Sequence, residues 1–97
     1  MSETGNSDSR KTITIVNERG LHARASAKLV EVACRWPEAT DIRVAKGDRE
    51  VDGRSILDLM MLGAARGDDI TLIVEGEDAP AALAEIAQLV ETGFGEE

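Results

Sequence analysis

The sequence predicts an α+β fold, an open-faced β-sandwich in which three helices cover one face of a four-stranded, mostly antiparallel sheet. Two observations lead to this prediction. The chain has 97 residues, which is enough for one hydrophobic core but not for two. Its apolar residues are spaced alternately as in strands and as in helices, in the order β-α-β-β-α-β-α. That number of elements in one small domain favours a layer of helices on a sheet.

The first strand is predicted over residues 12–16, where every residue is β-branched. The residues at 17–20 break this strand, and a helix follows over residues 23–36. Pro37 ends that helix because proline disfavours helical backbone in the residue before it. One face of the helix carries apolar residues at helical spacing, namely Ala25, Leu29, Val32, Ala33 and Trp36.

The later elements are marked by their boundaries as well as by their spacing. Ser55 is a favourable N-cap for a short helix, and Gly63 is placed to end it. Gly93 is placed to end the last helix in the same way. The predicted elements are strands 42–45 and 49–51 with a turn at 46–48 between them, helix 56–62, strand 70–74 and helix 79–92.

The two ends of the chain lack such patterns. Residues 1–10 are polar, and we expect them to form a disordered tail because they cannot bury apolar surface. Residues 94–97 are expected to fray at the C-terminus. The sequence therefore predicts a single domain over residues 11–93.

Composition excludes several classes of function. The net charge is −8 and the aromatic residues are two, so binding of nucleic acid or anionic lipid is not expected. We find no apolar run of about 18 residues and no signal peptide, and one cysteine cannot form an internal disulfide, so we expect a cytoplasmic chain without a membrane span. One histidine and one cysteine do not make a metal site, and nucleotide-binding glycine motifs are missing from the sequence.

Charge is distributed unevenly along the chain. Residues 1–66 hold all 11 basic residues and 10 acidic ones, whereas residues 67–97 hold nine acidic residues and no basic one. Arg19, Arg24 and Lys28 lie near His22, the only histidine, and Glu18 is the only acidic residue close to them in sequence. This pattern is typical either of solvated surface charge or of a site for an anion or an acidic partner.

His22 directly precedes the first predicted helix, whose N-terminal N–H groups and dipole favour anions. The first acidic residue of that helix is Glu31, so no side chain supplies a negative charge there, and Arg24 is close enough to bind a phosphoryl group. The alternative is an incidental histidine in an interaction module. We expect a functional His22 to be exposed beside free N–H groups, and an incidental one to be packed or to cap the helix itself.

Two motifs resemble those of a known family. Gly20-Leu21-His22-Ala23-Arg24 resembles the active-site motif of HPr, the histidine phosphocarrier of the bacterial phosphoenolpyruvate-dependent phosphotransferase system. Gly53-Arg54-Ser55-Ile56-Leu57, followed by Met60 and Leu62-Gly63, resembles its second motif. The resemblance covers roughly residues 11–93, and the predicted order of elements matches the HPr fold.

The resemblance implies a role for each matching residue. His22 would accept a phosphoryl group on Nδ1 from phosphorylated enzyme I and pass it to a histidine of an enzyme IIA-type protein. Arg24, Ala25 and Ser26 would stabilise that group. The chain would be a substrate of enzymes and not an enzyme, and it would need no cofactor, since phosphoenolpyruvate and Mg²⁺ serve enzyme I. Ser55 matches the serine that HPr kinase/phosphorylase modifies in some bacteria, and its alternative role is that of an N-cap.

The chain departs from the family motif at Ala25, where a proline is usual. Proline in the first turn fixes φ, and alanine lacks this rigidity although it favours helix. We therefore expect slower or less well positioned transfer without its loss. Arg19 replaces a small polar residue of many relatives and could add to phosphate or partner binding.

The second predicted helix offers a candidate docking surface. Leu57, Met60 and Met61 share one of its faces, which is either buried or an exposed apolar patch. The resemblance favours a docking patch that also includes Ala23 and Lys28, since HPr partners bind across the first two helices. We expect a monomer. The sequence leaves open whether the carrier serves sugar transport or a regulatory branch, either nitrogen-related or acting through Ser55.

Overall fold

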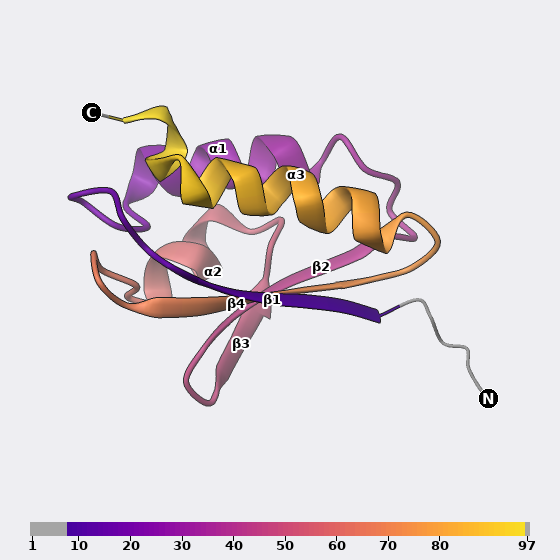
Figure 1. Cartoon of the computed structure of the whole chain (residues 1–97), viewed down its shortest axis with the longest axis horizontal. Helices are drawn as coiled ribbons and strands as arrows, with labels where there is room; N and C mark the ends of the chain where they lie inside the picture. Colours follow the sequence, from indigo (N-terminus) through magenta and orange to yellow (C-terminus); the bar gives the residue numbers. More distant parts are fainter. Residues whose placement is uncertain (1–7, 97) are drawn as a thin grey trace.

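The computed structural model describes residues 8–96 and has the predicted order of elements, with one turn of 3-10 helix, η2, added at the end (Figure 1). Apolar spacing, β-branched runs and boundary residues together therefore predicted the order of three helices and four strands along the chain. The elements are β1 (Asp8–Thr14), α1 (Ala23–Ala33), β2 (Asp41–Lys46), β3 (Arg49–Asp52), α2 (Ile56–Met61), β4 (Asp69–Glu75), α3 (Ala79–Glu91) and η2 (Gly93–Gly95).

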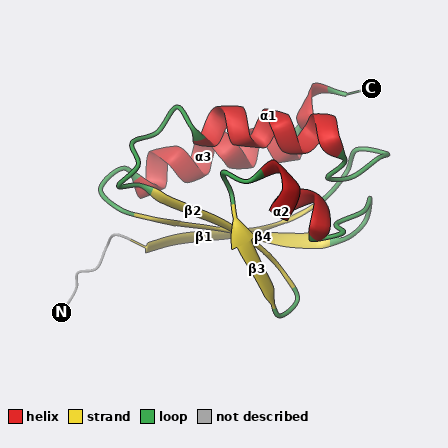
Figure 2. Ribbon diagram, turned by 180° about the vertical axis from the view of Figure 1, so that it is seen from behind, coloured by secondary structure: helices red, strands yellow, loops and turns green. Residues whose placement is uncertain are grey.

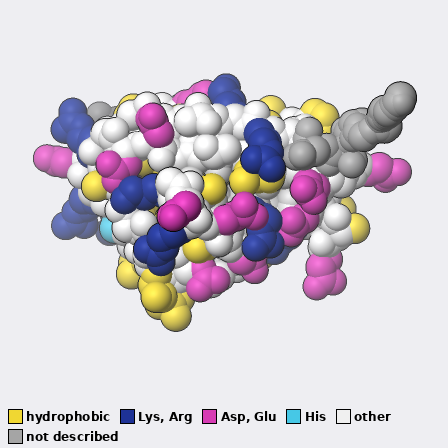
Figure 3. Space-filling model, turned by 90° about the horizontal axis from the view of Figure 1, so that it is seen from below, with side chains coloured by type: hydrophobic (Ala, Val, Ile, Leu, Met, Phe, Trp, Pro, Cys, Tyr) yellow, Lys and Arg dark blue, Asp and Glu magenta, His cyan; other side chains and the backbone are white. Residues whose placement is uncertain are grey.

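The four strands form one sheet in the order β1-β4-β2-β3, and each neighbouring pair is antiparallel. The three helices lie on the same side of this sheet, as Figures 1 and 2 show from opposite directions. The other face of the sheet is open to solvent and carries basic and acidic side chains interspersed (Figure 3). The predicted α+β class, with helices on one face of an antiparallel sheet, is confirmed.

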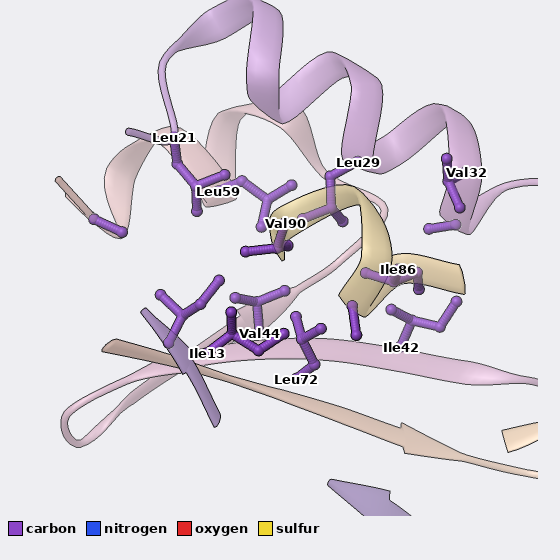
Figure 4. Packing of buried hydrophobic residues seen from close by; sticks show 14 of the residues in the cluster. Ile13, Leu21, Leu29, Val32, Ile42, Val44, Leu59, Leu72, Ile86 and Val90 are labelled. Atoms are coloured by element: carbon purple, nitrogen blue, oxygen red, sulfur yellow. The ribbon is translucent and has the colours of Figure 1, made fainter. Parts of the chain in front are cut away.

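The core lies between the sheet and the helices (Figure 4). Alternate residues of the strands point toward the helices, because successive side chains of a strand face opposite sides. The helices contribute residues three or four apart, which share one face. Side chains labelled in Figure 4 that illustrate this layer are Ile42, Val44 and Leu72 from the strands and Leu29, Leu59, Ile86 and Val90 from the helices.

The first strand begins earlier than the sequence predicts. Residues 8–10 belong to β1 and pair with residues 73–75 of β4. The prediction of a disordered tail over residues 1–10 is therefore wrong for its last three residues, and residues 1–7 lie outside the described part of the chain. Pairing with a strand far along the sequence ordered these polar residues, and local composition carries no signal of it.

Helix α1 ends three residues before the predicted end. Its C-cap is Cys34, and the backbone then turns, so Trp36 lies beyond the helix although it fits the apolar spacing. Trp36 is half-buried against the core, and its indole Nε1–H donates to Glu85 Oε1 at 2.9 Å. The apolar periodicity continued past the helix because the following turn also packs on the core.

The C-terminus differs most from expectation. The predicted fraying of residues 94–97 is wrong for the described residues, because Phe94 is 1% exposed within the core cluster and residues 93–95 form η2. Residue 97 lies outside the described part. None of the helices described is long and apolar enough to cross a membrane.

Arg54 ties the loop after α1 to the start of α2. Its guanidinium donates to the carbonyls of Thr40 at 2.8 Å, Trp36 at 3.1 Å and Pro37 at 3.0 Å. These carbonyls follow the C-terminal end of α1, where backbone acceptors need partners and a positive charge is favourable. A residue of the second sequence motif therefore has a structural role.

We expect Arg54→Met to lower the free energy of unfolding by about 1.5–3 kcal/mol, because hydrogen bonds from a charged group to three carbonyls are lost. Urea unfolding of the variant and the wild type measures this change, provided that the two proteins have the same m-value. Arg49→Met in the exposed part of β3 is the matched control and should change stability by no more than about 0.5 kcal/mol. Equal stabilities of the two variants would contradict the role assigned to Arg54.

Candidate functional site

The loop before α1 fixes the position of His22. Gly20 has a φ of +63°, and a Cβ at this position would lie 2.3 Å from the carbonyl oxygen of Ala64. Only glycine fits such a close approach in this conformation. The N–H of the next residue, Leu21, donates to the same oxygen at 3.0 Å, and the Leu21 side chain is buried. The glycine and leucine of the first motif therefore bind the loop to the body of the protein and leave the histidine at the helix end.

His22 is the N-cap residue of α1. Its backbone is extended, and its Nδ1 accepts a hydrogen bond from the N–H of Arg24 at 3.3 Å. The first turn of α1 contains no acidic residue. Nδ1 can accept this bond only when it carries no proton, so the geometry favours the ring with its hydrogen on Nε2 and its lone pair on Nδ1. A neutral ring with a free lone pair is the nucleophilic form of histidine.

The criterion for an incidental histidine requires a correction. The His22 side chain is 20% exposed and caps the helix itself, which the sequence analysis had assigned to a histidine without function. Capping therefore does not separate the two alternatives, because Nδ1 is also the nitrogen that the resemblance assigns to phosphoryl transfer. The hydrogen bond from Arg24 N–H to Nδ1 is long, at 3.3 Å, and is therefore weak.

Glu96, near the C-terminus, completes the surroundings of the ring. Its Oε2 lies 2.6 Å from His22 Nε2, and its Oε1 accepts a hydrogen bond from Asn17 Nδ2 at 3.1 Å. The hydrogen bond from His22 is the main cause that lowers the pKa of the Glu96 carboxyl below its ordinary value, and partial desolvation opposes it. Sequence reasoning missed this residue, since 74 positions separate it from His22.

A cleft of about 810 Å³ opens beside His22. Four basic side chains line it, namely Arg19, Arg24, Lys28 and Arg66, together with the acidic residues Glu18, Glu91 and Glu96. Arg66 was not singled out from the sequence because it comes from the loop before β4. No group of three or more side chains able to ligate a metal occurs within residues 8–96.

The three residues predicted to stabilise a phosphoryl group differ in their exposure and in their hydrogen bonds. Arg24 is exposed and lines the cleft. The side chain of Ala25 is buried, and its N–H has no acceptor within the described residues. Ser26 is buried, its hydroxyl donates to the Leu21 carbonyl at 3.1 Å, and its N–H donates to the His22 carbonyl at 2.8 Å.

The second motif forms α2, which packs beside α1. Ser55 is its N-cap, and Ser55 Oγ accepts a hydrogen bond from the N–H of Asp58 at 3.2 Å, so the predicted capping role is confirmed. Only Leu59 of the helix is buried. The remaining large apolar side chains are exposed, which favours an apolar patch over a buried face; they are Ile56, Leu57, Met60 and Met61.

The fold and the site together are those of a small α+β domain that presents one histidine at the N-terminus of a helix, beside a cleft lined by basic side chains. The family model described as the PTS HPr component phosphorylation site matches residues 9–92. The chain therefore belongs to the HPr family of the phosphotransferase system. It is an HPr phosphocarrier and not an enzyme, this family needs no cofactor, and its partners are enzyme I and IIA-type proteins.

Individual relatives agree with the family model. The phosphocarrier protein HPr of Pseudomonas aeruginosa is 45% identical over 85 residues, which are 87% of this chain and 92% of that protein. The phosphocarrier protein NPr of Shewanella violacea is 40% identical over 86 residues, 89% of this chain and 92% of that protein. The crystal structure of HPr-C-His from Thermoanaerobacter tengcongensis is 37% identical with a TM-score of 0.85, over 92% of this chain and 98% of that one.

The contact between His22 and Glu96 predicts a pH dependence. Because the pKa of Glu96 is lowered in the folded chain, the contact stabilises the fold above the pH at which the unfolded carboxyl ionises. This stabilisation is lost as the pH falls through the lowered pKa. In His22→Ala the pKa of Glu96 should rise toward its ordinary value, which an NMR titration of the side-chain carboxyl carbon measures.

Asp68 provides the internal control for this titration. The N–H of Ala65 and the ammonium of Lys46 lower the pKa of Asp68, and neither contact involves His22. Asp68 should therefore titrate identically in the two proteins. An unchanged Glu96 titration in His22→Ala would show that His22 does not cause its lowered pKa.

Proposed function

We propose that His22 is the residue of this phosphocarrier that holds the phosphoryl group, accepting it on Nδ1 from phosphorylated enzyme I and passing it to an enzyme IIA-type protein. The observation that supports this most is the direction of the two ring nitrogens. Nδ1 faces the N-terminus of α1 and Nε2 faces the carboxylate of Glu96. The lone pair is therefore at the end of the helix where a negative group is favourable.

The site can accommodate the charge that phosphorylation adds. A phosphoryl group carries about two negative charges near pH 7. When Nδ1 reacts, the N–H of Arg24 loses its acceptor and becomes available to a phosphoryl oxygen. The guanidinium of Arg24 and the N–H of Ala25 are further donors at the same end of the helix. Alanine supplies an N–H at a position where the proline of the family motif has none.

Docking of partners would use the exposed side of α2. Leu57 is 65% exposed and Met61 59%, and flexible methionines adapt to more than one partner. Lys28 and Arg24 on the neighbouring helix α1 supply positive charge, which would speed the encounter with an acidic surface. Ala23, the exposed first residue of α1, belongs to the same proposed interface.

The branch of the phosphotransferase system that this chain serves is a separate question. We place the chain in the cytoplasm as a monomer that binds proteins and not nucleic acid. Relatives named HPr and one named NPr match it at similar identity, so both transport and nitrogen-related regulation are compatible with the family. Ser55 is partly exposed at the start of α2, and HPr kinase/phosphorylase is its candidate partner if this chain signals through Ser55.

Incubation with enzyme I, Mg²⁺ and phosphoenolpyruvate should add one phosphoryl group to the wild-type protein and none to His22→Ala, as measured by intact mass. The group should be labile in acid and stable in alkali, as a phosphorylated nitrogen is. A cognate enzyme I that phosphorylates another HPr but not this chain would contradict the assignment of His22. Modification at Ser55 would then be the remaining function to test.

Leu57→Glu should weaken docking of enzyme I and raise the KM for this protein about tenfold, because it places a charge in an apolar contact. The value of kcat should change little, since Leu57 lies outside the helix end that holds His22. Ala81→Glu, an exposed position of α3, introduces the same charge and should leave both constants unchanged. Steady-state kinetics with enzyme I measure both, and equal KM values for the two variants would exclude the docking role of α2.

A further inference from the structure

The last described residues form a specific structure that the sequence alone gives no reason to expect. We call residues 93–96 the C-terminal turn. Gly93, Phe94 and Gly95 have φ values of +67°, +59° and +73°. A side chain makes this conformation unfavourable, so Phe94 adopts it only because its ring is buried in the core. Burial of Phe94 therefore directs the chain back across the start of α1.

Two side chains from other elements hold the C-terminal turn. Lys28 Nζ, from α1, donates to the carbonyl of Phe94 at 2.8 Å. Asn17, from the loop after β1, donates from Nδ2 to Gly20 O at 2.9 Å and to Glu96 Oε1 at 3.1 Å. Both neighbours of this amide nitrogen are acceptors, so the orientation of the amide is determined. Asn17 therefore links the loop that positions His22 to the carboxylate beside the His22 ring.

The contact between Glu96 and His22 is partly shielded from water. The side chains are 18% and 20% exposed, and the remaining carboxylate oxygen is held by Asn17. The ammonium of Lys28 also attracts this carboxylate. The same cleft is lined by Arg19, Arg24 and Arg66 and by the acidic residues Glu18 and Glu91. A carboxylate fixed by two donors in such surroundings accepts a stronger hydrogen bond than one in bulk water.

We propose that Glu96 is a positioning residue for phosphoryl transfer, because its carboxylate binds the hydrogen on His22 Nε2 and so directs the lone pair of Nδ1 toward the incoming phosphoryl group. The proposal rests on the assignment of His22 given above. Carboxylates that bind the second nitrogen of a reactive histidine fix its orientation in many sites. Here the carboxylate comes from the opposite end of the chain.

The reaction balances without loss of a proton from His22. The Nδ1 lone pair forms the bond to phosphorus, the bond between phosphorus and the donor breaks, and its electron pair stays with the donor. The ring keeps the hydrogen on Nε2 and gains positive charge, which the Glu96 carboxylate offsets. In the second transfer the electron pair of the N–P bond returns to Nδ1, and the ring is neutral again with the same hydrogen bond.

Glu96→Gln tests the proposal, because it keeps the shape of the side chain and removes the charge. We expect kcat for phosphorylation by enzyme I to fall about tenfold, with KM changed much less. Glu97→Gln removes the same charge at the next position and is the matched control. Proton NMR of the unphosphorylated proteins provides a second measurement. The carboxylate deshields the proton on His22 Nε2 in the wild type, so the signal of this proton should move upfield in Glu96→Gln and not in Glu97→Gln.

The outcomes separate this proposal from the assignment of His22. If the wild type accepts phosphate on His22 while Glu96→Gln keeps its kcat, or its Nε2–H signal does not move, Glu96 is not a positioning residue and the assignment of His22 stands. A faster Glu96→Gln would show that the carboxylate obstructs the site, which also overturns the proposal. Equal losses of kcat in Glu96→Gln and Glu97→Gln would indicate a general effect of charge on docking, and this result would also overturn the proposal. A wild type that accepts no phosphate would overturn both.

Discussion

The site depends on the close contact between Gly20 and the backbone of Ala64 and Ala65. A Cβ on residue 20 would lie 2.3 Å from one of these backbones and 2.8 Å from the other, so the two loops meet without an intervening side chain. The bond from Leu21 N–H to Ala64 O follows from this contact, and α1 then begins with His22 as its N-cap. The same contact brings the loop of Arg66 to the cleft, because Arg66 follows Ala65. One glycine thus sets the helix end, the direction of the histidine and part of its electrostatic surroundings.

Local patterns in the sequence were sufficient for the order of elements and for the centre of the site. Alternating and helical spacing depend on which face of each element is buried, and they gave every strand and helix in the right order. The prediction of an anion site at the start of α1 came from a glycine break, a histidine and a first turn without acidic residues. These are properties of neighbouring residues, so they can be recognised before the chain is folded.

Long-range contacts account for what the sequence did not predict. Residues 8–10 are ordered by pairing with β4, and Phe94 is ordered by burial under α1 and α3. Glu96 reaches His22 only after that burial reverses the chain. Propensity and spacing describe single elements, whereas these contacts depend on how finished elements pack. The motif identified the histidine but not the residues that hold it.

The fold shows which of the charged residues lie near His22. The last 31 residues hold nine acidic residues and no basic one, yet the cleft draws its four basic side chains from the first 66. Of the acidic residues of that part that the structure describes, Glu96 is the one in contact with His22. In the proposed transfer, a carboxylate on Nε2 would stabilise the positive ring formed on phosphorylation, while Arg24 and the helix N–H groups would bind the phosphoryl oxygens. The proposal thus assigns one sign of charge to each nitrogen of the ring, on the side where the reaction would create its counterpart.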